Sequence, residues 1–136
     1  MTNETTLTIS GNLTAAPELR TTQSGIPVAD LTIATTDRVL DRTTNEWRDG
    51  DTLFLRCTAW RELAENAAAS LGKGTRVIAT GRLHQRSYQD REGAQRTSVE
   101  LELDDIGASL RRARVNVSGS PRPVAVEESA TADTPF

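Results

Sequence analysis

The sequence predicts an all-β domain, a five-stranded barrel with one short helix between the third and fourth strands. Apolar residues alternate with polar ones in five separate stretches, as expected for strands with one buried face. A sixth stretch repeats its apolar residues every four positions, which indicates a helix. The chain has 136 residues, of which 36% are hydrophobic, enough for one domain with its own core.

The first two strands are predicted from alternating stretches with turn-forming residues between them. Residues 7–11 alternate and end at Gly11, which suggests a bulge or a close approach of two backbones. Pro17 breaks the pattern, and Gly25 follows a serine in a pair typical of a hairpin turn. Residues 28–35 then alternate again and form the second predicted strand.

The later elements begin after a polar stretch at 37–51, which we expect to be a long flexible arm or a hairpin. Residues 53–60 form the third predicted strand, the Ala-rich stretch 61–71 the helix, and residues 76–88 and 97–103 the last two strands. On these strands, alternation predicts that the following residues face the core: Leu53, Leu55, Cys57, Ala59, Val77, Ala79, Gly81, Leu83, Val99, Leu101 and Leu103. This order of elements is that of a Greek-key barrel of the oligonucleotide-binding type, the OB-fold.

The composition changes near the end of the chain. We expect residues 1–117 to form the domain and residues 118–136 a flexible, mildly acidic tail, because the tail has too few apolar residues to offset the entropy of ordering. One cysteine excludes an internal disulfide, and neither a signal peptide nor a membrane-length apolar run is present. These features predict a cytoplasmic protein, associated with the nucleoid if it binds DNA.

Two aromatic rings and a guanidinium share the polar face of the third predicted strand. Alternation places Phe54, Arg56 and Trp60 opposite the core side. Outward rings beside a positive charge suit a partner with flat bases and phosphates, and single-stranded nucleic acid has both. The alternative is a half-buried face that a loop or another subunit covers.

The net charge of −3 conceals a basic segment. Residues 73–96 contain six basic residues and two acidic ones. Within this segment Arg82 and Arg86 share the outward face of the fourth strand, where we expect them, with Arg56, to contact phosphates rather than act as ordinary solvated charges. Trp47 lies in the polar arm and has two interpretations, a DNA contact or a ring folded over the barrel rim.

The sequence contains no convincing metal or catalytic site. His84 has no second His or Cys at ligand spacing, so a metal ion is not expected. Cys57 lies on the apolar face and is interpreted as packing. Lys73 is followed by glycine rather than Ser or Thr, so its Gly-rich surroundings indicate a helix end and not a phosphate loop. We therefore expect no cofactor and no enzymatic reaction.

Several short segments occur in an order found in a known family. They are Gly11-Asn12-Leu13, Pro17-Glu18-Leu19-Arg20, Thr32-Ile33-Ala34-Thr35, Leu53-Phe54-Leu55-Arg56-Cys57, Gly81-Arg82-Leu83 and the terminal Pro135-Phe136. Over about residues 5–110 the chain resembles bacterial single-stranded DNA-binding proteins, especially those of actinobacteria. The resemblance implies that Phe54, Trp60 and Tyr88 stack DNA bases. It also implies a homotetramer that protects single-stranded DNA during replication, recombination and repair.

The sequence departs from the family's pattern in two places. Val39-Leu40 stands in the arm where the family often has a further aromatic residue, which should weaken or shorten the binding path. The tail has few acids before its end, so the resemblance implies only weakened recruitment of replication and repair proteins through Asp133, Pro135 and Phe136. A secondary paralogue with a specialised role fits these departures. The alternatives are a primosomal accessory of the same fold and an adaptor whose rings bind protein.

Overall fold

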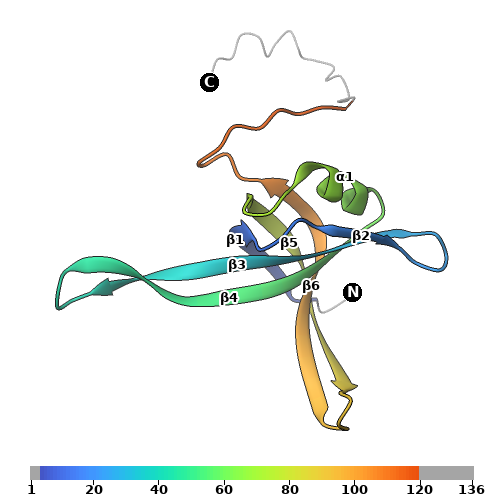
Figure 1. Cartoon of the computed structure of the whole chain (residues 1–136), viewed down its shortest axis with the longest axis horizontal. Coiled ribbons are helices and arrows are strands. Elements are labelled where there is room, and N and C mark those ends of the chain that lie inside the picture. Colours follow the sequence, from blue (N-terminus) through green and yellow to red (C-terminus); the bar gives the residue numbers. More distant parts are fainter. Residues whose placement is uncertain (1–3, 120–136) are drawn as a thin grey trace.

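The computed structural model describes residues 4–119, which form a curved sheet of six strands and one helix (Figure 1). The strands are β1 (Thr6–Leu13), β2 (Glu18–Thr21), β3 (Pro27–Asp41), β4 (Glu46–Trp60), β5 (Arg76–Gln89) and β6 (Gln95–Ala108), and helix α1 (Glu62–Ser70) follows β4. The sheet order is β1-β5-β6-β4-β3-β2, and pairing of β1 with β3 closes the barrel. The expected all-β fold with one helix before the penultimate strand is confirmed.

Strand β2 is an addition to the five predicted strands. It pairs with the start of β3, and a turn containing Gly25 joins the two, as the sequence predicted. Gly25 has a φ of 85°, a backbone conformation that favours glycine. All four residues of β2 are exposed, so the strand has no buried face and leaves no alternation to detect in the sequence.

Two hairpin arms extend from the barrel (Figure 1). The polar stretch 37–51 is the outer part of the β3–β4 hairpin, and the outer parts of β5 and β6 form the second arm. The prediction that Leu53 and Val99 face the core is wrong, because they are 56% and 45% exposed. Both residues lie where their strands leave the barrel. They are on the same side of the strand as the buried Leu55 and Leu101, but at this point no core covers that side.

The core is built from the inner side chains of the strands and from two small residues of α1. Ile33, Leu101 and Val77 are fully buried, and Ala64 of the helix joins the same cluster, while Ala67 of the helix is buried as well. Helix α1 begins directly after β4, where the Arg61 N–H donates to the Pro27 carbonyl at 2.8 Å. This hydrogen bond fixes the start of the helix directly after Trp60, the last residue of β4. The helix covers one end of the barrel.

Two glycines allow the sheet to bend into a barrel. A Cβ on Gly11 would overlap the carbonyl of Ala34, at the point where β1 meets β3. A Cβ on Gly81 would overlap the carbonyl of Glu102, beside the irregularity between Thr80 and Gly81 in the β5–β6 pairing. The close approach that the sequence suggested at Gly11 is confirmed, and any other residue at these two positions would push the strands apart.

Candidate nucleic-acid interface

The outward face of β4 presents two large rings that the barrel leaves uncovered. Phe54 is 63% exposed and Trp60 is 39% exposed, whereas the core-side residues between them are buried. The partner of Phe54 on β3 is Ala34, whose small side chain leaves the ring face open. Below, Phe54, Arg56 and Trp60 are called the aromatic face.

Tyr88 belongs to the other arm. It lies near the end of β5, is 48% exposed and pairs with Arg96 on β6. Next to it, Asp90 accepts hydrogen bonds from the Arg96 guanidinium and from the backbone of Glu92, each at 2.9 Å. The Arg96 hydrogen bond is the largest cause of the lowered pKa of Asp90, and bonds from the backbone of the turn add to it. Tyr88 therefore stands on a hairpin whose turn is fixed by its own hydrogen bonds.

Trp47 reaches the same side of the β3–β4 ribbon as Phe54 because of a bulge. From Thr36 to Arg38, β3 advances two residues while β4 advances three, from Thr52 back to Asp49. The extra residue shifts the alternation of β4, so Trp47, opposite Leu40, joins the outward set. Strict alternation from Phe54 would have placed Trp47 on the other side. Its ring is 60% exposed, so the structure leaves it open rather than folded against the described part of the chain.

Arg56 lines one of two open grooves to which β4 contributes residues. One groove, on the β3 side, is lined by Arg56 together with Glu18 and Asp30. The other lies over β4, β6 and β5 and includes Trp60 and Arg86. Among residues 4–119, no carboxylate lies within ion-pair distance of Arg56, although Glu100 is its neighbour on the parallel strand β6. Arg56 is therefore a basic group on the first groove that has no ion-pair partner in the described chain, although Glu18 and Asp30 line the same groove.

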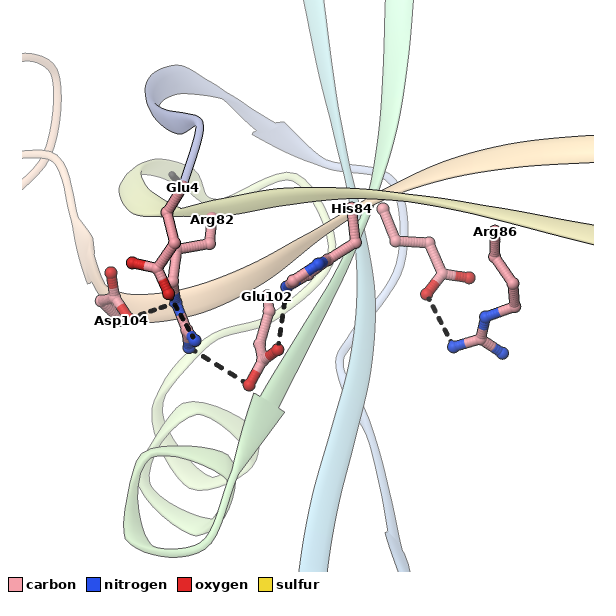
Figure 2. A network of polar contacts seen from close by, with 7 residues as sticks. Glu4, Arg82, His84, Arg86, Glu102 and Asp104 are labelled. Atoms are coloured by element: carbon pink, nitrogen blue, oxygen red, sulfur yellow. Dashed lines mark ion pairs between the residues drawn. The ribbon is translucent and has the colours of Figure 1, made fainter. Parts of the chain in front are cut away.

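Arg82 has a different environment, because three carboxylates surround its guanidinium (Figure 2). Its Nη2 lies 3.1 Å from Glu102, its Nε 3.2 Å from Asp104 and its Nη1 3.9 Å from Glu4. The Nε–H has no hydrogen-bond partner among the described residues, so its contact with Asp104 is an ion pair without that hydrogen bond. Glu102 is the main cause of the raised pKa of Arg82. Of the three predicted phosphate-binding arginines, Arg82 is the one most engaged with acids.

A row of acids on β6 continues beside the outward face of β5. Glu102 also lies 3.2 Å from the His84 imidazole, and Glu100 lies 3.6 Å from the Arg86 guanidinium (Figure 2). The Arg86 side chain is 71% exposed, so this second contact is a weak surface pair. Alternation places Glu100 and Glu102 on the side of β6 opposite Val99, Leu101 and Leu103, but it does not reveal which basic residues they oppose, because that depends on the strand register.

The remaining expectations concern other classes of site. Residues 4–119 contain no cluster of three His, Cys, Asp or Glu side chains arranged to hold a metal ion. No helix within the same residues has the length and apolar character needed to cross a membrane. The predicted partner-binding residues Asp133, Pro135 and Phe136 lie outside the described residues.

Comparison with known proteins finds single-stranded DNA-binding proteins similar to this chain. The model of the "Single-strand binding protein family" matches residues 4–109. The single-stranded DNA-binding protein of Paenarthrobacter aurescens is 59% identical over 122 residues, which cover 90% of this chain and 71% of that protein. Its counterpart from Mycobacterium bovis is 53% identical over 146 residues and covers 100% of this chain and 89% of that protein.

A solved structure agrees with these relatives. The crystal structure of the small single-stranded DNA-binding protein from Streptomyces coelicolor has a TM-score of 0.71 and 38% identity. The match covers 82% of this chain and all of that chain. These names describe binding proteins rather than enzymes, and the resemblance to actinobacterial members is confirmed. The chain therefore belongs to the single-strand binding protein family.

Proposed function

We propose that this protein binds single-stranded DNA without sequence preference by stacking bases on Phe54, Trp60 and Tyr88. The observation that carries the proposal is the exposure of two large rings on β4 in positions where they contribute nothing to the core. Exposed rings of this size suit bases of any sequence because every base has a flat π-face. The names of the relatives support the same partner.

Phosphate contacts come from basic residues beside the rings. Arg56 and Arg86 take the main part, because the described chain leaves Arg56 without an ion pair and Arg86 with only a weak one. Arg82 takes a smaller part, since DNA must compete with three carboxylates for its guanidinium. Trp47 extends the stacking path along the β3–β4 arm, from the side of the ribbon that it shares with Phe54.

The biological setting follows from the resemblance and the sequence. Residues 1–117 act as the binding domain of a cytoplasmic homotetramer in which one strand wraps several barrels, since linking several short sites raises the effective concentration. The protein protects exposed strands in replication, recombination and repair. Its terminal residues Asp133, Pro135 and Phe136 recruit other proteins weakly, because few acids precede them.

A fluorescence titration tests this function directly. The chain has two tryptophans, so Trp47→Phe leaves Trp60 as the only strong emitter. Oligo-dT should quench that emission, and high salt should restore it as the strand dissociates. Trp60→Ala should weaken binding by about 1–3 kcal/mol, the contribution of one stacked base. Mass measurement during the same titration gives the number of subunits.

The matched control is Trp60→Phe, which keeps a ring at the same place and should retain most of the affinity. If the Trp60→Ala protein is folded and binds oligo-dT with unchanged affinity, Trp60 is not part of the binding site. Absence of Trp60 quenching with every oligonucleotide would favour an adaptor whose rings bind protein over a DNA-binding protein. A monomer at micromolar concentration would contradict the wrapping model.

A further inference from the structure

The basic residues of the described chain separate into two groups according to their partners. Five of the fifteen lie within ion-pair distance of a carboxylate, among them Arg86, 3.6 Å from Glu100, and Arg96, 2.9 Å from Asp90. The other ten have no carboxylate within ion-pair distance among residues 4–119, and five of these ten form a group at one end of the barrel, where β5 begins and the chain leaves β6. This group, called the basic patch below, consists of Lys73, Arg76, Arg111, Arg112 and Arg114.

Hydrogen bonds hold the two segments of the basic patch side by side. The Ser109 N–H donates to the carbonyl of Arg76 at 2.8 Å, so the chain leaves β6 beside the first residue of β5. The Ser109 hydroxyl, on a residue that is 8% exposed, then accepts from the Arg111 N–H at 3.2 Å. In the neighbouring loop, the Asn12 side chain donates to the Gly74 carbonyl at 3.0 Å. Three exposed arginines therefore start from an anchored point next to Lys73 and Arg76.

The basic patch differs from the aromatic face in its composition. Residues 106–119 contain three arginines but no acid and no aromatic residue. The acids of the neighbouring helix, Glu62 and Glu65, are in its first turn, at the Trp60 end, whereas the patch begins after its last turn. This concentration of one charge attracts phosphates and offers no ring for a base.

We propose that the basic patch binds the sugar-phosphate backbone of the same single strand after it has passed the aromatic face. This inference rests on the proposed function and adds a second contact region to it. Helix α1 separates Trp60 from the patch, and its nine residues span about 13 Å. A strand longer than the aromatic face can therefore continue past the helix and reach Arg111, Arg112 and Arg114.

The test compares short and long oligo-dT on the full chain carrying R111Q, R112Q and R114Q together. The short oligonucleotide is the shortest that gives full Trp60 quenching, and the long one is several times that length. Each lost phosphate contact lowers the slope of log affinity against log salt by about 0.7, so three contacts lower it by about 2. We expect that decrease with the long strand and no change with the short one. The variant R111K, R112K and R114K keeps the charge and should keep both slopes.

Two results would overturn the inference. The first is an unchanged salt slope of the Gln variant on the long strand. The second is a decrease that disappears when the tail acids are also neutralised by E127Q, E128Q and D133N, since the patch would then hold the tail rather than DNA. Failure of the proposed function has a different signature, because Trp60 would not be quenched by either strand. An Arg-dependent slope without quenching would support the patch and reject the aromatic face.

Discussion

The two faces of β4 alternate residue by residue and differ in almost every other respect. Leu55 and Cys57 are 6% and 2% exposed in the core, whereas Phe54 and Trp60 are 63% and 39% exposed on the other side. The inner residues pack against other strands, whereas the rings of the outer residues are exposed to solvent. From Phe54 to Trp60, fold stability and DNA binding should therefore separate by the parity of the residue number.

The outward faces of β4 and β5 differ again, although both carry arginines. Arg56 has no carboxylate within ion-pair distance in residues 4–119, while Arg82 has three. Strand β6 puts an acid opposite each of them, Glu102 opposite Arg82 and Glu100 opposite Arg56, but only Glu102 lies within ion-pair distance of its arginine. An outward arginine is thus available to phosphate where the acid of the neighbouring strand pairs with another residue, as Glu100 does with Arg86.

The largest expected effect tests the inner face of β4. Leu55→Ala removes a buried side chain and should cost about 2–5 kcal/mol of unfolding free energy. Affinity for oligo-dT should hold at temperatures where the variant is folded, because Leu55 does not reach the aromatic face. Denaturant unfolding and the oligo-dT titration measure the two quantities.

Phe54→Ala is the matched variant on the outer face, and it should show the opposite result. We expect it to weaken binding with little change in stability, since its ring is exposed. Equal losses of stability in the two variants would show that the faces of β4 do not divide their tasks.

Much of the fold follows from local patterns in the sequence. The period-two alternation of β4 correctly separates Leu55, Cys57 and Ala59 from Phe54 and Trp60 within the barrel. The same pattern fails for Leu53, because alternation reports which side a residue is on and not whether a core is present there. The limits of the barrel depend on contacts between distant segments, which no local pattern contains.

The candidate site was less predictable than the fold for a related reason. Trp47 joins the outward set only because β4 contains a bulge, and a Cβ on Gly50 would lie 2.7 Å from the Val39 side chain. The ion pairs of Arg82 depend on the register of β5 against β6. One extra residue in β4 decides the side on which Trp47 lies, and the register of β5 against β6 decides which acid lies opposite Arg82. The alternation in each strand is compatible with several registers.

A smaller effect tests the contrast between the two arginines. Arg56→Gln should lower the affinity for oligo-dT and reduce the salt slope by about 0.7, the value of one phosphate contact on a single strand. Arg82→Gln removes the same charge but should change the slope less, because its guanidinium is already neutralised by carboxylates. Titration of both variants at several salt concentrations measures the difference. Equal slopes would mean that the acids of β6 move aside when DNA binds.

The last and smallest expected effect concerns Cys57, on the inner face of β4. Burial raises the pKa of the Cys57 thiol from 9.0 to about 12, because the thiolate would lose its hydration in the core. Its neutral form is therefore favoured by folding, so this contribution to stability is complete below about pH 9 and is lost as the pH rises toward 12. At pH 8 a thiol reagent should modify the native protein far more slowly than the unfolded chain, since only the thiolate reacts. Leu55→Ala should accelerate the modification by raising the population of open molecules, whereas Phe54→Ala should not. Rapid modification of the native protein would show that the inner face of β4 is open to solvent.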